Sequence, residues 1–388
     1  MKFVINQKVL EKTLAHANCI IERKHVVPIL GYVLLDASSD NVLTITSTNM
    51  DMTIVDTVKC IVSEAGRYCL PAGLVYDIVR KMKAGADITF EYSSSDNSIN
   101  MLNDKAVFSI HYMDADSFPP ITAFDYDVSF SMNTSVLKKA LEVAKVAMLQ
   151  DNSRFHLNGI HMHYDGDHGD SKIKFVATDL FRIACVSTVA PKEAKNLEPL
   201  IISKRTILEI LKMVDGSFDE EVQISASENR ISFKLATSEQ IKTEFSARLI
   251  NGTFPEYKTA LDVSNDKILI IDTKQFVDAL DRVSTVVIDS TNSIKLQITK
   301  DKLILTGNSR ELGSATEEMD ADFNALEPLE ICFNSRYLLE ILKEIETPQV
   351  KLLLAQSNSS TIVEPIYLEA PSEIDMIFAV MPIEIVHS

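Results

Sequence analysis

Hydrophobic residues recur with helical spacing in three segments that lie far apart along the chain. The segments VLEKTLAHA from Val9, VLKKALEVA from Val136 and QFVDALDRV from Gln275 superpose without a gap, and apolar residues coincide at i, i+4 and i+7. Because residues with this spacing share one face of a helix, the pattern predicts three amphipathic helices of the same kind.

A second helical pattern follows each of these segments. PAGLVYDIVRK from Pro71, SKRTILEILKM from Ser203 and NSRYLLEILKE from Asn334 each place an acidic residue three positions before a basic one. Side chains with this spacing are neighbours on a helix, and proline, serine and asparagine are common at helix starts. Each repeat is therefore predicted to contain two helices.

Two further landmarks have the same order and similar spacing in all three repeats. One is a strand-like segment, LTITSTN, KFVATD or LILTGNS, and the other is a step into proline at Pro119, Pro255 or Pro382. A fixed order of four landmarks indicates an internal repeat of domain length. We predict three similar tandem domains, over residues 1–125, 126–256 and 257–388.

Between the helices, hydrophobic and polar residues alternate with a period of two. Such alternation is typical of half-buried strands, and polar runs such as SSSDNS are predicted to be the turns between them. The expected fold class is α+β, with two helices packed on antiparallel sheets in each domain. The alternating positions are Leu43/Ile45, Ile88/Phe90/Tyr92, Phe108/Ile110, Ile231/Phe233/Leu235 and Phe245/Ala247/Leu249.

The composition argues against several classes of function. Only 11 of the 388 residues are glycine, and neither a G-x-G-x-x-G nor a G-x-x-x-x-G-K-[ST] phosphate loop occurs. The five cysteines are scattered without a C-x-x-C pair, which favours reduced thiols and argues against a zinc ribbon. The chain has no apolar run of membrane-spanning length, and its first residues do not form a signal peptide. We therefore expect a cytoplasmic protein that has no membrane association and needs no cofactor.

Charge is distributed unevenly along this acidic chain. The formal net charge is −17, from 38 basic and 55 acidic residues. Yet the four predicted helices of the first two repeats, over residues 8–17, 71–83, 134–148 and 203–213, contain more basic than acidic residues. The helices of the third repeat do not. A basic helical face on an acidic body would attract a polyanion to that face, although lysines also decorate the wet faces of many amphipathic helices. Since no helix looks like a reader of base edges, any DNA contact should be to phosphates and independent of sequence.

A pair of histidines offers an alternative function. His161 and His163 lie on one face of a predicted strand, and Asp165, Asp167 and His168 follow closely. Two histidines at i and i+2 can bind a metal ion, which would suit a metal-dependent hydrolase. A polar strand edge that runs into a turn is the simpler interpretation. A third possibility is a three-domain scaffold that has no role on DNA.

Several motifs together resemble those of the bacterial beta sliding clamps, the processivity subunits of the replicative DNA polymerase. The resemblance covers nearly the whole chain and is specific because the motifs keep their order and spacing. They are Met1-Lys2-Phe3, Val27-Pro28-Ile29-Leu30-Gly31, Leu157-Asn158-Gly159, Ala177-Thr178-Asp179 with Arg182, Phe254-Pro255-x-Tyr257 and Val380-Met381-Pro382.

The resemblance implies a non-catalytic DNA polymerase III beta subunit. A head-to-tail homodimer would close into a six-domain ring around double-stranded DNA, with helices lining the hole and sheets forming the outer wall. A clamp loader would open the ring with ATP that the loader itself binds, which agrees with the missing phosphate loops in this chain.

The resemblance also implies partners and a site for them. Clamps of this family bind short linear motifs of the replicative polymerase catalytic subunit, the clamp loader, repair polymerases, mismatch-repair proteins and ligase in an apolar pocket between the second and third domains. The equivalent pocket residues here are Leu157, Thr178, Arg182, Ile183, Pro255, Ala260, Ala379 and Met381. A neighbouring groove maps to Arg154, Phe181, Asn334, Tyr337, Pro382 and Ile383.

Three more expectations follow from the same resemblance. Leu180 and Phe181 stand where the family commonly has glycine and histidine, and Glu384 stands where a basic residue is common, so the preferred partner motif should be shifted. The dimer contact should involve Phe108 and Ile110 of the first domain and Val286 and Val287 of the third. The duplex should be faced by Lys12, Lys24, Arg80, Lys138, Lys139, Arg205 and Lys212, and by the loop from Gln150 to Arg154.

Overall fold

The structure is a computed structural model that describes residues 1–22, 27–121, 124–151, 153–166, 171–287, 291–367 and 373–383. The chain forms two compact units. Unit 1 comprises Met1–Lys138, Pro191–Glu198 and Arg205–Leu249, and unit 2 comprises Lys139–Ala190, Pro199–Lys204 and Ile250–Ser388. Among the helices of the described ranges, none is long and apolar enough to cross a membrane.

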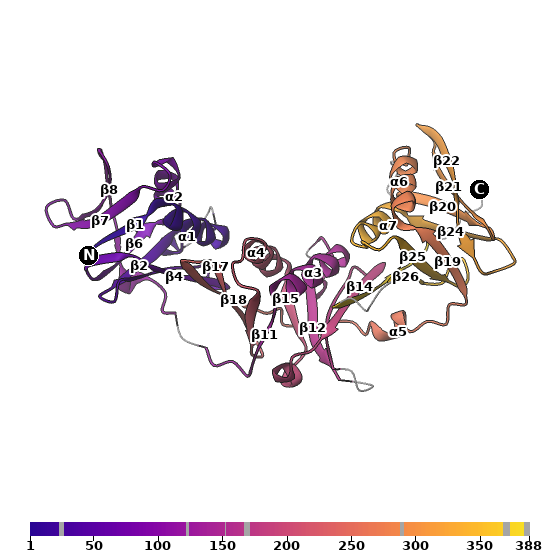
Figure 1. The fold of residues 1–388 in the computed structure, drawn as a ribbon, viewed down its shortest axis with the longest axis horizontal. Helices are drawn as coiled ribbons and strands as arrows, with labels where there is room; N and C mark the ends of the chain where they lie inside the picture. The colour runs from indigo at the N-terminus through magenta and orange to yellow at the C-terminus, as the bar shows by residue number, and fades with distance from the viewer. Residues whose placement is uncertain are drawn as a thin grey trace. The chain divides into compact units, whose positions relative to one another are not determined.

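Unit 1 contains two antiparallel sheets and the first pair of predicted helices, α1 (Gln7–Ile20) and α2 (Ala72–Lys81). The sheet orders are β5-β1-β7-β8-β9 and β10-β6-β2-β3-β4-β18-β17-β16-β11. Helices α1 and α2 lie side by side, and α1 also contacts β3 and β4 (Figure 1). The strands are β1 (Lys2–Asn6), β2 (Tyr32–Ser38), β3 (Val42–Thr48), β4 (Met52–Lys59), β5 (Ile61–Glu64), β6 (Gly66–Pro71), β7 (Asp87–Ser93), β8 (Ser98–Asn103), β9 (Ala106–Ile110), β10 (Met113–Asp114), β11 (Val128–Asn133), β16 (Glu221–Ala226), β17 (Arg230–Ser238) and β18 (Ile241–Arg248).

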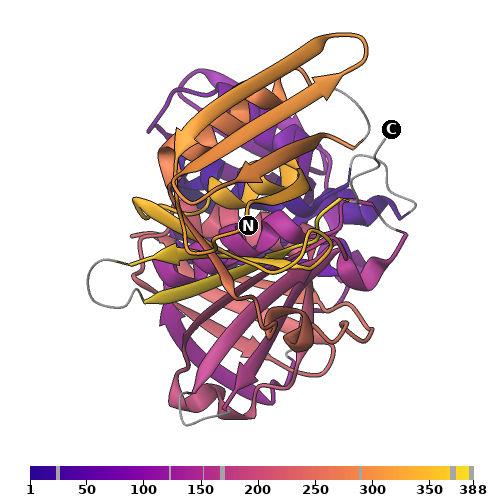
Figure 2. The ribbon, with the colours of Figure 1, turned by 90° about the vertical axis from the view of Figure 1, so that its right-hand side faces the viewer.

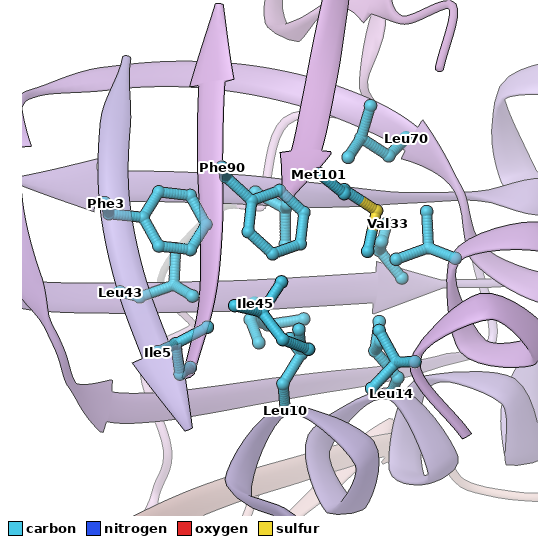
Figure 3. Packing of buried hydrophobic residues seen from close by; sticks show 14 of the residues in the cluster. Phe3, Ile5, Leu10, Leu14, Val33, Leu43, Ile45, Leu70, Phe90 and Met101 are labelled. Atoms are coloured by element: carbon cyan, nitrogen blue, oxygen red, sulfur yellow. The ribbon is translucent and has the colours of Figure 1, made fainter. Parts of the chain in front are cut away.

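The core of the N-terminal part of unit 1 explains the first helical pattern. Leu10 and Leu14 of α1 are fully buried and point toward the strands, as Figure 3 shows. Phe3 and Phe90 stack within the same core, with ring centroids 4.7 Å apart. Burying one such side chain contributes about 1.5–3 kcal/mol, so this apolar stripe fixes α1 on the sheets.

Unit 2 repeats this arrangement with a nine-stranded and a four-stranded antiparallel sheet. Their orders are β15-β12-β13-β14-β27-β26-β25-β19-β23 and β22-β21-β20-β24. Helices α6 (Thr273–Ser284) and α7 (Ser335–Leu342) contact each other, and α6 contacts strands of both sheets; Figure 2 faces this region, with the four-stranded sheet in orange. The strands are β12 (Gly159–Asp165), β13 (Lys172–Thr178), β14 (Arg182–Val189), β15 (Leu200–Ser203), β19 (Lys267–Asp272), β20 (Ser293–Ile298), β21 (Lys302–Ser309), β22 (Gly313–Asp320), β23 (Asp322–Phe323), β24 (Leu329–Asn334), β25 (Gln349–Leu354), β26 (Thr361–Ile366) and β27 (Ile374–Val380).

All six predicted helices are present, and local hydrogen bonds set where four of them begin. A side chain just before α1, α3 (Thr134–Ala144), α6 and α7 accepts a bond from a backbone N–H in the first turn, which satisfies a donor that a helix start would leave open. These side chains are Asn6, Asn133, Asp272 and Asn334. The remaining helices are α4 (Lys204–Asp215) and the short α5 (Lys258–Leu261).

Two of the predicted boundaries are wrong by a few residues. The helix expected over residues 134–148 ends at Ala144 and continues as a 3₁₀ turn at Lys145–Ala147. Leu249, expected on a strand, lies just beyond the end of β18 at Arg248.

The sequence repeat and the compact units do not divide the chain in the same way. Strands β11 and β16–β18 of the middle repeat complete the nine-stranded sheet of unit 1, whereas β12–β15 belong to the nine-stranded sheet of unit 2. The junctions are β4 with β18, where Met52 pairs with Ala247, and β14 with β27, where Arg182 pairs with Val380. Each nine-stranded sheet therefore joins strands of two successive repeats.

Candidate functional site

The hairpin turn between β13 and β14, at Asp179–Phe181, is held by its own side chains. Thr178 Oγ1 accepts a bond from Leu180 N at 3.0 Å, and Asp179 Oδ1 accepts bonds from Phe181 N and Arg182 N, each at 3.0 Å. Leu180 has a φ of 76°, in the left-handed region that few residues other than glycine adopt. As a result, Leu180 and Phe181 project with exposed fractions of 46% and 60%.

Arg182 anchors this turn to helix α7. The Arg182 guanidinium is nearly buried, bonds Asp179 Oδ2 at 3.0 Å and pairs with Glu340 Oε2 at 2.6 Å. The Cζ atom of the Arg182 guanidinium also lies 4.3 Å from the centroid of the Tyr337 ring. Burial alone would raise the pKa of Glu340, but hydrogen bonds from Arg336 and Arg182 outweigh it and lower that pKa.

A mainly apolar pocket of about 180 Å³ lies beside the turn, within unit 2. Ala379, Thr178 and Tyr257 are almost fully buried, whereas Met381 at the rim is 44% exposed. The concave shape and apolar lining suit the insertion of a few apolar side chains of a ligand. The lining residues are Thr178, Leu180, Phe181, Arg182, Ile183, Pro255, Glu256, Tyr257, Ala260, Ser360, Ala379 and Met381.

Backbone hydrogen bonds fix the chain beyond β27, which brings Met381 to the rim of the pocket. Met381 N donates a bond to the carbonyl oxygen of Phe181 at 2.8 Å, and Ile383 N donates to the carbonyl oxygen of Cys332 at 2.8 Å. Pro382 lies between these two anchored residues. The backbone of Met381 is therefore fixed while its side chain stays accessible.

The other expected pocket and groove residues are not among the residues that line this pocket; they are Leu157, Arg154, Asn334, Tyr337, Pro382 and Ile383. Leu157 is fully buried, and Asn334 caps α7 instead of presenting a free side chain. Arg154 lies in an exposed loop, and Tyr337 packs on Arg182. Sequence reasoning did not assign Glu256, Tyr257 and Ser360 to the pocket. The Phe254-Pro255-x-Tyr257 motif was a signal for Tyr257, but no pattern marked Ser360.

The two histidines support the pocket wall. His163 Nε2 lies 2.8 Å from the Tyr257 hydroxyl, and the His161 ring stacks on Phe254 with centroids 4.7 Å apart. Burial lowers the pKa of His161 to about 4, so the ring is neutral at pH 7. The described residues contain no group of three or more potential His, Cys, Asp or Glu metal ligands, and Asp167, His168 and Asp170 lie outside the described residues.

The basic residues expected to face DNA are mostly ion-paired within their own units. Lys12 is half-buried and donates to the carbonyl oxygen of Thr237, and burial lowers its pKa. The acid-to-base spacing in the sequence marked the pairs Arg80–Asp77 and Lys212–Glu209, but it did not reveal the other three pairs, whose partners lie far apart along the chain. The pairs are Arg80–Asp77 at 3.2 Å, Lys138–Asp215, Lys139–Glu346 at 2.7 Å, Arg205–Glu22 at 2.9 Å and Lys212–Glu209 at 3.0 Å.

The loop expected on DNA is only partly described. Gln150 Oε1 accepts a bond from Lys204 Nζ at 2.6 Å, and Arg154 is exposed. Lys24 lies outside the described residues.

Among the sheet edges, β5, β9 and β22 expose strand surface. In β9, Val107 is 62% and Phe108 is 37% exposed, and β9 is the last strand of its sheet. Strand β22 is the last strand of the four-stranded sheet. Ile110 and Val287 are buried in their own units and Val286 is half-buried, so Phe108 is the best exposed of the four residues expected at a dimer contact.

Three family models match successive parts of the chain. The N-terminal, central and C-terminal domains of the DNA polymerase III beta subunit match residues 1–122, 131–256 and 258–378, respectively. The beta sliding clamp of Caulobacter vibrioides is 30% identical over 363 residues, which cover 94% of this chain and 95% of that protein. The beta sliding clamp of Pseudomonas aeruginosa is 28% identical and covers 99% of this chain and 100% of its own length.

Solved structures of such clamps have the same fold. A Bartonella birtlesii sliding clamp bound to griselimycin superposes with a TM-score of 0.91 and 29% identity, over 99% of this chain and 100% of that chain. A Caulobacter crescentus beta sliding clamp gives a TM-score of 0.92 and 29% identity, with 99% of both chains covered.

Proposed function

The chain belongs to the beta sliding clamps, the non-catalytic processivity subunits of DNA polymerase III, and from this premise we propose how it encircles DNA and where its partners dock. Its fold is α+β with three tandem clamp domains. DNA and the polymerase are the partners that the family implies. The hydrolase and the scaffold without a DNA role are thereby set aside. We retain residues 1–125, 126–256 and 257–388 as the proposed domain limits.

The ring is proposed to be a head-to-tail homodimer. An unpaired sheet edge can add a strand from another chain, and β9 and β22 are such edges in different sheets. Pairing of two different edges is a heterologous contact, which closes when the rotation permits. Two half rings of three domains each would give six domains around the duplex. Because Val107 and Phe108 supply exposed apolar surface at β9, this edge supports the proposal directly.

Contact with DNA is proposed to be weak, reversible and independent of sequence. The candidate cations Arg80 and Arg205 are exposed and pair with exposed carboxylates, whereas the exposed Lys212 pairs with the buried Glu209. Exposed ion pairs contribute only about 0–1 kcal/mol, so phosphates can replace the carboxylates of Arg80 and Arg205 at little cost. Such exchange suits a clamp that slides, since topology rather than affinity would keep it on the duplex.

Partner docking is proposed at the pocket beside the β13–β14 turn. The observation that carries this proposal is the fixed backbone of Met381 next to the exposed side chains of Leu180, Phe181 and Met381. A peptide with a glutamine, a leucine and an apolar end would place its apolar anchors in this cleft. The proposed occupants are linear motifs of the polymerase catalytic subunit, the clamp loader, repair polymerases, mismatch-repair proteins and ligase.

The test of encirclement combines solution mass with retention on DNA. Light scattering should give two chains per particle, and clamp loaded on nicked circular DNA should resist salt that blocks initial binding, because salt screens phosphate contacts but not topology. Cutting the circle should release it. Equal salt sensitivity of loading and retention, or one chain per particle, would contradict the ring.

A matched pair of variants tests the sheet edge. Phe108→Asp should shift the protein toward monomer, because it places a charge on β9. Phe218→Asp changes a phenylalanine of unit 1 that is 65% exposed outside the strand edges, and it should leave the dimer intact. If both variants remain dimeric, β9 is not the contact.

A further inference from the structure

Unit 1 contains a second copy of the turn that borders the pocket in unit 2. Between β3 and β4, Thr48 Oγ1 accepts a bond from Met50 N at 3.1 Å, and Asn49 Oδ1 accepts bonds from Asp51 N at 3.1 Å and Met52 N at 2.7 Å. Met50 has a φ of 77°, against 76° for Leu180. Arg248 N donates to the carbonyl oxygen of Asp51 at 2.8 Å, just as Met381 N donates to Phe181.

Strand register identifies which residues replace the pocket side chains. Met52 pairs with Ala247 where Arg182 pairs with Val380, so Arg248 takes the place of Met381. Arg230 pairs with Arg248 on the next strand and takes the place of Ser360. Two apolar or small positions of the pocket are therefore arginines in unit 1.

These two arginines are incompletely neutralised by the protein. They lie directly opposite each other on β17 and β18, an arrangement that is unfavourable for like charges. The carboxylate paired with Arg248 belongs to Asp51, is 72% exposed and lies 3.9 Å away. Arg230 Nη1 is buried and has no hydrogen-bond partner among the described residues. An additional acceptor at this place would satisfy that donor.

Apolar side chains flank the arginines. The Arg230 guanidinium lies 4.0 Å from the centroid of the Phe124 ring. This cation–π contact holds the guanidinium in place. Phe124 is 37% exposed, and Met50 at the tip of the turn is 55% exposed. We call Met50, Phe124, Arg230 and Arg248 the arginine surface.

We propose that the arginine surface is a second docking site, for an extended acidic peptide that also carries an apolar side chain. Carboxylates of the peptide would pair with Arg230 and Arg248, and the apolar side chain would lie against Met50 or Phe124. Because the chain has a net charge of −17, most of its surface repels an acidic peptide. Two clustered arginines therefore provide a place where such a peptide is attracted. Nucleic acid fits less well, because its continuous row of phosphates would meet the exposed carboxylates of Asp51, Asp125 and Asp127, whereas a peptide can place uncharged residues opposite them.

Fluorescence anisotropy with the full-length dimer tests this site. The probe is a labelled ten-residue peptide with leucine and phenylalanine between pairs of glutamates, and its control has glutamine in place of every glutamate. Arg230→Gln combined with Arg248→Gln should weaken binding of the acidic peptide at least tenfold. Arg67→Gln, which removes an arginine of unit 1 that is ion-paired with Asp36, should not. Met381→Ala should not either, which separates this site from the pocket in unit 2.

Several outcomes would overturn the proposal. They are equal binding of the acidic and glutamine peptides, equal weakening by Arg67→Gln, and loss of binding with Met381→Ala alone. Competition by a twelve-nucleotide oligothymidine that responds to the same two arginines would identify nucleic acid as the ligand instead. If melting shows that the double variant is unfolded, Met50→Glu provides the test, because this exposed side chain can change without disturbing the core, and it should also weaken binding at least tenfold.

Discussion

The β3–β4 and β13–β14 hairpins have the same backbone turn and different surroundings. Thr48 and Thr178 make the same bond to the residue at positive φ, and Asn49 and Asp179 cap the next two N–H groups. In unit 2 the turn borders an apolar pocket, whereas the equivalent place in unit 1 holds two arginines. The comparison shows that the repeat preserves the scaffold of a site while the side chains decide what it can bind.

The largest difference between the two hairpins is a buried arginine that only the β13–β14 hairpin has. Arg182, nearly buried between Asp179 and Glu340, has Met52 as its counterpart in unit 1. Arg182→Met should lower the free energy of unfolding by about 2–4 kcal/mol, because it leaves the nearly buried carboxylate of Asp179 without its cation and leaves Glu340 with Arg336 alone. Thermal or urea unfolding measures this loss.

The matched variant is Arg248→Met, which changes an exposed arginine at the other hairpin. Its side chain is 64% exposed, so the free energy of unfolding should change by no more than about 0.5 kcal/mol. Equal losses for Arg182→Met and Arg248→Met would show that burial does not distinguish the two arginines.

The second difference concerns peptide binding. A peptide with glutamine, leucine and an apolar end should bind in the micromolar range, about −8 kcal/mol. Met381→Ala should weaken it by about 1–3 kcal/mol, because the peptide loses an exposed anchoring contact while the fold is kept. Calorimetry together with a melting curve checks both statements.

Converting the pocket to the chemistry of unit 1 sharpens this test. Ser360→Arg with Met381→Arg should abolish binding of the same peptide, and Arg248→Ala should leave it unchanged. Unchanged affinity in a well-folded Met381→Ala protein would refute the pocket assignment.

The third difference is a pH dependence that should exist only in unit 2. Strand register places Leu34 of unit 1 where His161 lies, and both pack near the phenylalanine of an F-P step. The pKa of His161 is about 4 in the folded protein, below the usual 6.5 of an unfolded chain. Between pH 6.5 and pH 4 the unfolded chain therefore binds a proton at His161 that the native state does not bind. The contribution of neutral His161 to the stability of the native state is fully present above pH 6.5 and is lost as the pH falls toward 4.

By this linkage, the free energy of unfolding should fall by about 1–2 kcal/mol between pH 7 and pH 5 because of His161. His161→Leu, which copies unit 1, should remove that part of the pH dependence. Urea titrations of both proteins at the two pH values measure it. An identical slope in the variant would place the titrating group elsewhere.

The sequence predicted the repeated parts of this molecule well and the connections between repeats poorly. The six helices were found because each keeps an apolar face, as Leu10 and Leu14 do in α1. The continuity of β14 with β27 was not predicted, because strand alternation says which residues face the core but not which strand is the neighbour. Ser360 enters the pocket only through that pairing.

Charge shows the same limit. The cations of the helices could be counted from the sequence, and the i,i+3 spacing marked the partners of Arg80 and Lys212, but the partners of the other cations could not be predicted. Glu22, which pairs with Arg205, is remote in the chain, and Glu346 is remote from Lys139. The proximity of these paired residues depends on tertiary packing, and a count of charges along one helix gives no information about that packing.

The smallest expected effect tests whether the two turns are the same backbone structure. A side chain at positive φ costs about 1–2 kcal/mol, which glycine avoids, but glycine also loses about 0.5–1 kcal/mol through the greater freedom of the unfolded chain. Met50→Gly and Leu180→Gly should therefore change the free energy of unfolding by less than about 1 kcal/mol. Met50→Val and Leu180→Val should be worse than the glycine variants, since a β-branched side chain fits this region least. If the two turns are equivalent, the difference in free energy of unfolding between the glycine and the valine variant should agree between them within about 0.5 kcal/mol. Paired melting curves measure this difference. A clear disagreement would show that the surroundings, and not the local bonds of Thr48 and Thr178, hold one of the turns in place.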